Sequence, residues 1–298
     1  MAGEETSHYT LSPEKTTLNN NPKRSLLAKQ EMQIALTNDD GPESSGFIEM
    51  YSILRRRHKV RAVVPESQRS GDGKALTFHK PLRIREIKLA GDVRAYAING
   101  TPADAVYAAI FLLGGDPDFV VSGINGGDNT TLHSIFTSGT VAAVLEAAIM
   151  GIPGMALSLN TRREVWFSPT HQNPYMKRAA ALSGMMIDFV ERNPFPREID
   201  FININFPERI TQRTQIETTS LARSKFRNFL RRKVDPNGMP YYWLDGRKVA
   251  RFGVHTDAYN VYIKEKISVT PVSLSSLASV DDRQRSYISE LTSSIRRA

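Results

Sequence analysis

The chain has 298 residues, of which 40% are hydrophobic, a formal net charge of +8 and no cysteine. The absence of cysteine excludes disulfides, thiolate nucleophiles and cysteine-type zinc sites. The length fits one large α/β domain or a domain with an appendage. No apolar run reaches the roughly eighteen residues of a membrane span, so we expect a cytoplasmic protein with no membrane partner.

The positive charge is compatible with an anionic substrate or with a nucleic acid, because positive potential attracts both. The basic runs lie at residues 55–59 and 223–233, where they are interrupted and unaccompanied by a nucleic-acid-binding motif. We interpret them as solvated faces and do not expect a nucleic acid partner.

Residues 1–30 are polar and are predicted to form a flexible extension rather than a targeting signal. The first predicted strand then stops abruptly at Asn38, Asp39 and Asp40. Gly41 and Pro42 favour a turn there, so the two aspartates gather beyond the strand end instead of pointing to opposite faces. Adjacent carboxylates repel each other unless a cation joins them, which suggests a hard metal ion.

An amphipathic helix over residues 46–57 and a buried strand over residues 60–64 follow, which predicts a right-handed βαβ unit. The next loop, residues 65–73, is polar and glycine-rich and contains Ser70. In a doubly wound sheet this loop lies at the same edge as the paired aspartates, where ligands bind.

Residues 82–87 and 93–98 alternate like the half-buried strands of a hairpin. Thr101 and Pro102 then have the residue types of a helix N-cap and first turn, and the helix is predicted to end near residue 113. A short strand over residues 119–122 runs into Asn125 and two glycines, which repeats the pattern of an apolar strand followed by an amide.

Ser138, Gly139 and Thr140 precede an apolar helix over residues 141–150. Unpaired amides at such a helix start can bind an anion, although a plain helix cap uses the same residue types. Strands over residues 154–159 and 201–205 and a helix over residues 176–192 complete the α/β pattern.

Beyond residue 207 the pattern changes to short β-like runs, with a turn at residues 235–238 and the aromatic run Tyr241-Tyr242-Trp243. These features favour extended hairpins. Exposed hairpins with aromatic residues often complete an oligomer interface. A strand over residues 267–272 and a helix over residues 281–297 follow. We therefore expect an extension (1–30), a Rossmann-like catalytic domain (31–207) and an oligomerisation region of hairpins, strand and helix (208–298).

Asp39, Asp40, Ser70 and Asn125 are thus predicted to meet at one sheet edge. All four are oxygen donors, which suit magnesium, manganese or calcium better than zinc.

Histidine general bases are a competing interpretation. His133 is the strongest of them, whereas His58, His79 and His171 are interpreted as structural or solvated. The chain lacks a Gly-x-Ser-x-Gly nucleophile elbow and a Gly-x-Gly-x-x-Gly motif after the first strand, which argues against a serine hydrolase and a dinucleotide oxidoreductase.

Five motifs, in order and approximate spacing over residues 32–275, resemble the SurE family of survival-protein nucleotidases and acid phosphatases. They are Thr37-Asn38-Asp39-Asp40-Gly41, Arg69-Ser70-Gly71, Asn99-Gly100-Thr101-Pro102-Ala103-Asp104, Val121-Ser122-Gly123-Ile124-Asn125 and Ser138-Gly139-Thr140-Val141. The resemblance implies a Rossmann-like, mostly parallel α/β sheet flanked by helices. It also implies a C-terminal region exchanged between subunits, in a domain-swapped dimer or a tetramer.

The resemblance further implies a 5′/3′-nucleotidase that acts on nucleoside monophosphates with one divalent ion per subunit, magnesium or manganese. The implied metal ligands are Asp39, Asp40, Ser70 and Asn125; Asn38 would lie beside the metal, and Ser138, Gly139 and Thr140 near the phosphate. The segment with Thr130-Thr131-Leu132-His133 departs from the Gly-Asp-Asp turn common in bacterial members.

The expected chemistry is in-line attack by a metal-activated water. Asp39 or Asp40 would orient or deprotonate the water, and Asn125 and the helix start at Ser138 would stabilise charge on the phosphoryl oxygens. Alternatives are a phospho-aspartate intermediate, a nucleotide-binding module without turnover, and a broader acid phosphatase or exopolyphosphatase.

Overall fold

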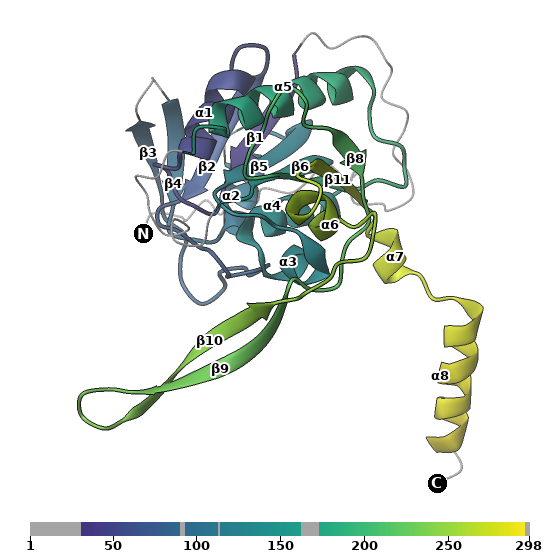
Figure 1. Cartoon of the computed structure of the whole chain (residues 1–298). Coiled ribbons are helices and arrows are strands. Elements are labelled where there is room, and N and C mark those ends of the chain that lie inside the picture. Colours follow the sequence, from purple (N-terminus) through teal and green to yellow (C-terminus); the bar gives the residue numbers. More distant parts are fainter. Residues whose placement is uncertain (1–30, 90–92, 113, 162–172, 296–298) are drawn as a thin grey trace, which may run out of the picture.

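The computed structural model describes residues 31–89, 93–112, 114–161 and 173–295 (Figure 1). The predicted N-terminal extension, the turn expected at Gly91 and Asp92, and His171 lie outside these residues. The described chain contains a nine-stranded sheet with the order β3-β4-β2-β1-β5-β6-β7-β11-β8. Its strands are β1 (Gln33–Thr37), β2 (Lys59–Pro65), β3 (Ile84–Leu89), β4 (Val93–Ile98), β5 (Phe119–Asn125), β6 (Gly154–Leu159), β7 (Phe201–Phe206), β8 (Ile216–Thr218) and β11 (Ile267–Val272).

The centre of the sheet is parallel. β1 pairs in parallel with both β2 and β5, and β6 and β7 continue the parallel series. β3 is antiparallel to β4, as the predicted hairpin requires, and β11 is antiparallel to β7. The Rossmann-like, mostly parallel fold is confirmed, and the carboxyl ends of β1, β2 and β5 lie at one edge.

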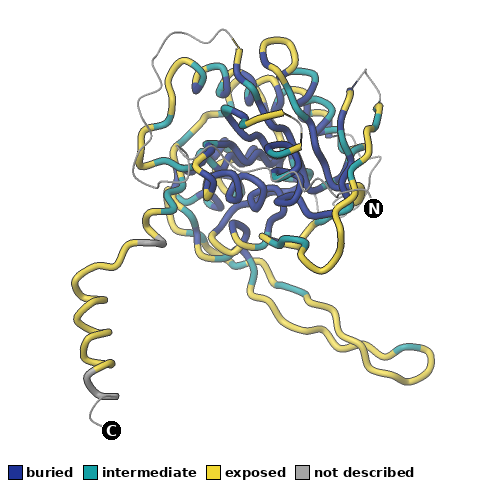
Figure 2. The backbone as a smooth tube through the Cα atoms, turned by 180° about the vertical axis from the view of Figure 1, so that it is seen from behind, coloured by how far each residue is buried: buried dark blue, intermediate teal, exposed yellow. Residues whose placement is uncertain are grey.

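Helices cover both faces of the sheet. The described chain has the helices α1 (Ser45–Leu54), α2 (Pro102–Phe111), α3 (Thr131–Thr137), α4 (Gly139–Ile149), α5 (Met176–Arg192), α6 (Asp257–Tyr262), α7 (Ser275–Ala278) and α8 (Asp282–Ile295), of which α8 does not cover the sheet. α1 packs with α5 on one face and α2 with α4 on the other. Phe47 and Ile187 belong to the first apolar cluster, and Val106 and Val144 to the second. Figure 2 shows the buried residues, in dark blue, in the interior of the sheet and its covering helices.

The start of α2 has the predicted cap. The Thr101 hydroxyl accepts a hydrogen bond from the Asp104 amide at 3.1 Å, and the Asp104 carboxylate accepts one from the Thr101 amide at 2.8 Å. Pro102 is the first helical residue. This reciprocal capping box satisfies two amides that the helix leaves unpaired.

The region after residue 207 contributes to two different structures. β8 and β11 belong to the main sheet. β9 (Phe226–Val234) and β10 (Pro240–Lys248) instead form a separate antiparallel hairpin that projects from the body, as does α8 (Figures 1 and 2). The Asp235 carboxylate closes the hairpin turn by accepting hydrogen bonds from the amides of Asn237 and Met239.

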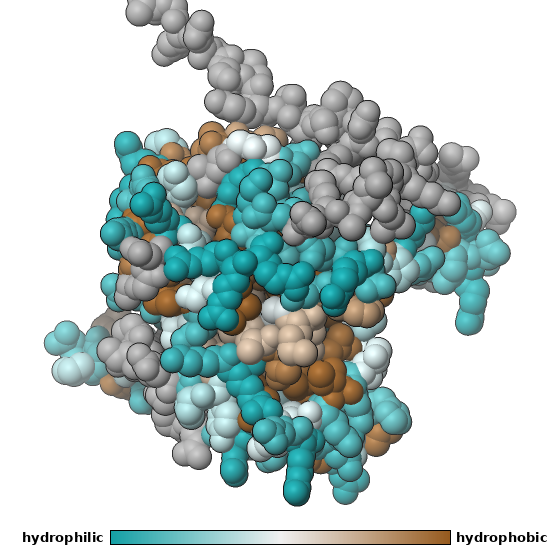
Figure 3. Space-filling view, turned by 90° about the horizontal axis from the view of Figure 1, so that it is seen from above, coloured by the Kyte–Doolittle hydropathy of each residue, from teal (hydrophilic) through white to brown (hydrophobic). Residues whose placement is uncertain are grey.

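The surface seen from above is mostly hydrophilic, and its largest apolar area lies near the middle (Figure 3). Among the described residues, no single helix has the length and apolarity to cross a membrane; only α3 and α4 taken together, with a 75° bend between them, meet those two criteria.

Candidate metal and phosphate site

Asp39 lies directly beyond β1 and is 3% exposed. Its Oδ1 accepts a hydrogen bond from the Thr140 hydroxyl at 2.5 Å. A methyl group built on Gly139 would stand 2.7 Å from Cβ of Asp39, so the backbone of α4 approaches the aspartate closely. The carboxyl end of β1 and the N-terminus of α4 therefore meet at this side chain.

Asp40 connects the loops that follow β2 and β5. Its Oδ2 accepts a hydrogen bond from the Gly126 amide at 2.9 Å. Gln68 donates to Asp40 Oδ1 at 3.5 Å and to the Ser70 hydroxyl at 3.0 Å. Asn125, the residue before Gly126, donates to the Gly127 carbonyl through its amide nitrogen at 2.6 Å, a bond that does not use its amide oxygen. The predicted donors are thus gathered by these loops at one sheet edge.

The two carboxylates are electrostatically unfavourable in this setting. Burial and the charge of Asp40 raise the pKa of Asp39 to about 7, against the lowering effect of the Thr140 hydrogen bond. Burial also raises the pKa of Asp40, although the Gly126 amide opposes this. A divalent cation beside both groups would offset the desolvation and the repulsion.

Asn38 provides a further sign that the site suits a cation. Its amide nitrogen donates to the Gly41 carbonyl at 2.7 Å, which closes the turn after β1. Gly41 has a φ of +89°, a conformation that favours glycine. Within the described chain, the buried Oδ1 of Asn38 has no hydrogen-bond partner. A free buried acceptor next to paired carboxylates fits a hard cation or its hydration shell.

Ser138 is the N-cap of α4, and its hydroxyl accepts a hydrogen bond from the Val141 amide at 3.2 Å. Both Ser138 and Thr140 are buried. The motif can therefore be both a helix cap and an anion site. Ser138 caps α4, and the start of α4 lies against Asp39. The positive end of the helix dipole at that start favours an anion.

These motifs belong to a known family. The family model described as survival protein SurE matches residues 34–228. The chain belongs to the SurE family. Proteins named 5′-nucleotidase SurE from Methanocella arvoryzae and Thermofilum pendens are 36% and 39% identical to it, over 81% and 83% of this chain and 92% and 93% of their own lengths. The crystal structure of the SurE protein from Aquifex aeolicus has 28% identity and a TM-score of 0.67, covering 85% of this chain and 96% of that one.

Sequence reasoning missed several contacts of this SurE site. Gln68 joins Asp40 to Ser70, and the Gly126 amide binds Asp40. The Thr161 hydroxyl donates to the Gly126 carbonyl at 3.0 Å. The position of Gln68 in the same predicted loop as Ser70 is only weak sequence evidence for its contacts. The contact of the Gly126 amide could not be predicted from residue type, because every residue except proline has such an amide.

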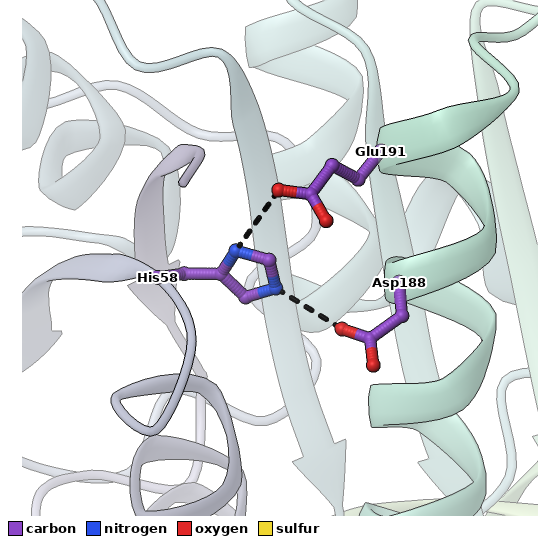
Figure 4. Close-up of side chains that lie close together, drawn as sticks. All are labelled: His58, Asp188 and Glu191. Atoms are coloured by element: carbon purple, nitrogen blue, oxygen red, sulfur yellow. Dashed lines mark hydrogen bonds and ion pairs between the residues drawn. The ribbon is translucent and has the colours of Figure 1, made fainter. Parts of the chain in front are cut away.

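A second group that could bind a metal in this SurE protein is His58 with Asp188 and Glu191 (Figure 4). The two ring nitrogens of His58 face different carboxylates, at 3.3 Å from Asp188 and 3.8 Å from Glu191. Arg57 pairs with the same carboxylates at 2.5 and 3.6 Å. His58 precedes β2, at the sheet edge opposite Asp39. We interpret the group as an ionic clamp between the end of α1 and α5, which agrees with the structural role expected for His58.

The alternative general base His133 is exposed on α3, and His79 is exposed in the loop before β3. The contacts described around Asp39 and Asp40 come from carboxylates, amides and hydroxyls.

Proposed function

We propose that this SurE protein is a divalent-metal-dependent phosphomonoesterase that hydrolyses nucleoside monophosphates, with 5′-nucleotides as its principal substrates. The observation that carries the proposal is the meeting of Asp39, Asp40, the Gly126 amide and Thr140 at the carboxyl edge of the sheet. The relatives named 5′-nucleotidase supply the substrate class.

In this proposal one magnesium or manganese ion per subunit is held by Asp39, Asp40, Ser70 and Asn125. The donors are all oxygens, which such ions prefer. When bound, the ion polarises a phosphoryl oxygen and lowers the pKa of a water ligand.

The chain's own groups have separate tasks. Asp39 or Asp40 orients the attacking water and accepts its proton, and Thr140 fixes the orientation of the Asp39 carboxylate. Asn125 and the amides at the start of α4, near Gly139, stabilise the negative charge that develops on the phosphoryl oxygens.

The decisive experiment measures released phosphate over a panel of metals (magnesium, manganese, calcium, zinc) and substrates (5′- and 3′-nucleoside monophosphates, inorganic polyphosphate). Asp39→Asn and Asp40→Asn should each lose nearly all activity while circular dichroism shows a folded protein. Asp72→Asn is the matched control, because Asp72 is an exposed carboxylate in the same loop as Ser70.

Three results would contradict the proposal. Folded aspartate variants with activity close to that of Asp72→Asn would remove the metal assignment. Saturable nucleotide binding without phosphate release under every metal would favour a non-hydrolytic binding module. Manganese binding retained by an Asp39→Asn/Asp40→Asn double variant would place the ion elsewhere, with the His58 group as the first candidate.

We also propose that the hairpin β9–β10 and α8 form a homo-oligomer interface, as a domain-swapped dimer or a tetramer. Leu230, Trp243 and Leu244 are 65%, 60% and 71% exposed on the hairpin, and Tyr287 is 67% exposed on α8. Such apolar side chains are usually covered in an oligomer. Light scattering of the full chain should give a dimer or tetramer mass, and Trp243→Asp with Leu244→Asp should lower it. A monomer at micromolar concentration would contradict this proposal.

A further inference from the structure

The loop that follows β5 is held by the C-terminal region of the chain. The amides of Thr131 and Leu132 donate to the Asp257 carboxylate at 2.5 Å and to the Ala222 carbonyl at 2.7 Å. The Asp257 carboxylate also accepts from the Ala222 amide at 2.9 Å. These bonds hold the start of α3, where the loop after Asn125 ends, against the segment before β9 and against Asp257 of α6.

Asp128 is the centre of this contact. Its side chain is 1% exposed, and Lys225 approaches it with a side chain that is 10% exposed. Nζ of Lys225 donates to Oδ1 of Asp128 and also to the Asp128 backbone carbonyl, both at 2.8 Å. Tyr262 donates to Oδ2 at 2.5 Å, and the Thr130 hydroxyl donates to Oδ1. Lys225 therefore fixes the main chain of the loop as well as a buried charge.

Charge makes this arrangement a strong constraint. Burial alone would raise the pKa of Asp128, but the charge of Lys225 and the hydrogen bonds lower it overall. The carboxylate is thus ionised at neutral pH and depends on its partner. If Lys225 loses its charge, a buried carboxylate is left uncompensated, and the loop must move to hydrate it or the group must take up a proton.

The base of the β9–β10 hairpin lies at this network. Lys225 immediately precedes β9, and Lys248, the last residue of β10, lies over the Tyr262 ring with Nζ 3.6 Å from its centroid. On its other side, the loop is fixed to the sheet: the Asn129 amide donates to Asn205 and the Asn203 side chain donates to the Asn129 carbonyl.

We infer that Lys225 is a positioning residue of the catalytic site, which holds the loop through Asp128 so that Asn125 and the Gly126 amide reach the metal and Asp40. The inference rests on the proposed function for the role of the metal. Asp128 lies two residues after Gly126 and three after Asn125, so a displacement at Asp128 is transmitted over a very short stretch of backbone. Residues that orient metal ligands in this way commonly change metal affinity by about 10- to 100-fold when they are replaced.

The test is direct binding of Mn²⁺ by electron paramagnetic resonance without substrate, together with kcat and KM for a nucleoside 5′-monophosphate. Lys225→Met should weaken Mn²⁺ binding by about tenfold and lower kcat, and Lys225→Arg should restore part of both, because it returns the charge. Lys266→Met is the control, because Lys266 lies in the same C-terminal region and pairs with Glu217 instead of Asp128. It should bind Mn²⁺ as the wild type does.

The outcomes separate the inference from the proposed function. A wild-type protein that binds no Mn²⁺ and releases no phosphate would refute the proposed function. A normal wild type with a folded Lys225→Met variant of unchanged Mn²⁺ affinity and kcat would refute the positioning role, even if the melting temperature fell. If Lys225→Met does not fold, Tyr262→Phe removes one hydrogen bond to Asp128 and keeps the ring; it should weaken Mn²⁺ binding, and an unchanged affinity would overturn the inference.

Discussion

The hydroxyl of Thr140 donates a hydrogen bond to Oδ1 of Asp39 at 2.5 Å, although the two residues are 101 positions apart in the chain. This bond joins the start of α4 to the end of β1, and both groups are buried. It lowers the pKa of Asp39 against the larger effects of burial and of Asp40. Thr140 thus favours the ionised, correctly oriented carboxylate that a metal ligand needs.

Thr140→Val keeps the shape of the side chain and removes this hydrogen bond. We expect kcat to fall by about tenfold or more, because a hydrogen bond to a charged group contributes about 1.5–3 kcal/mol. Phosphate release at saturating metal measures the effect. Thr137→Val is the control: Thr137 is the last residue of α3, and its hydroxyl donates to the His133 carbonyl, so this variant should stay near wild type. Equal losses in the two variants would count against a specific role for Thr140.

Asp39 should also give the metal-free protein a characteristic pH dependence. Its pKa rises from the ordinary 3.8 to about 7 on folding, so between these values the folded state binds more protons than the unfolded state. The protonated Asp39 side chain therefore contributes to the free energy of unfolding at low pH. This contribution is lost as the pH rises through 7. With a chelator present to remove metal ions, we expect the free energy of unfolding of the wild type to fall between pH 4 and pH 7. The fall should exceed that of Asp39→Asn by on the order of a few kcal/mol.

Urea denaturation at a series of pH values measures this difference, and added Mn²⁺ should reverse the loss in the wild type at pH 7. If the free energy of unfolding of the wild type and of Asp39→Asn changed in parallel with pH, the pKa of Asp39 would be the same in the folded and unfolded states, which would contradict the prediction.

The sequence predicted the strands whose carboxyl ends carry the candidate site. β1 ends at Thr37, before Asp39, Asp40 and the turn at Gly41, and its parallel pairing with β2 and β5 brings the carboxyl ends of these strands to the same edge. β6, α5 and β11 have the predicted bounds because their apolar periodicity ends at clear turn residues. The family and the Rossmann-like fold were also predicted, and both are confirmed.

The contacts that depend on distant pairing were not predictable in this way. Lys225 and Asp128 are 97 positions apart, and in sequence Lys225 belongs to a basic run that resembles a solvated face. α3 was missed because it is short and begins at Thr131, in a segment of polar, β-branched residues that do not favour a helix. The division at residue 207 and the individual site residues stay predictions.

Gly139 should tolerate no side chain. A methyl group there would lie 2.7 Å from Cβ of Asp39, which is too close, and 3.1 Å from both Oδ2 of Asp39 and Cγ of Pro102, which are tight contacts. We expect Gly139→Ala to displace Asp39 and to lower kcat/KM at least tenfold, with a modest loss of stability of about 1–3 kcal/mol from overpacking. Gly253→Ala, where the added methyl group meets only Thr256 at 3.5 Å, is the control. Wild-type kcat/KM in Gly139→Ala would show that the helix start can move without affecting the site.

Thr131 is strained in a way that a substitution can relieve. It is a buried β-branched residue with a φ of +82°, and within the described chain its hydroxyl has no hydrogen-bond partner. A strained backbone of this kind costs about 1–3 kcal/mol, and glycine, which is entropically unfavourable by up to about 1 kcal/mol, adopts it without strain. We therefore expect Thr131→Gly to raise the free energy of unfolding by about 1 kcal/mol.

Thr130→Gly should instead destabilise the protein, because Thr130 has a φ of −74° and its hydroxyl binds Asp128. Urea denaturation of both variants at pH 7 measures the pair, and a loss of stability in Thr131→Gly would mean that the loop does not hold Thr131 in this conformation.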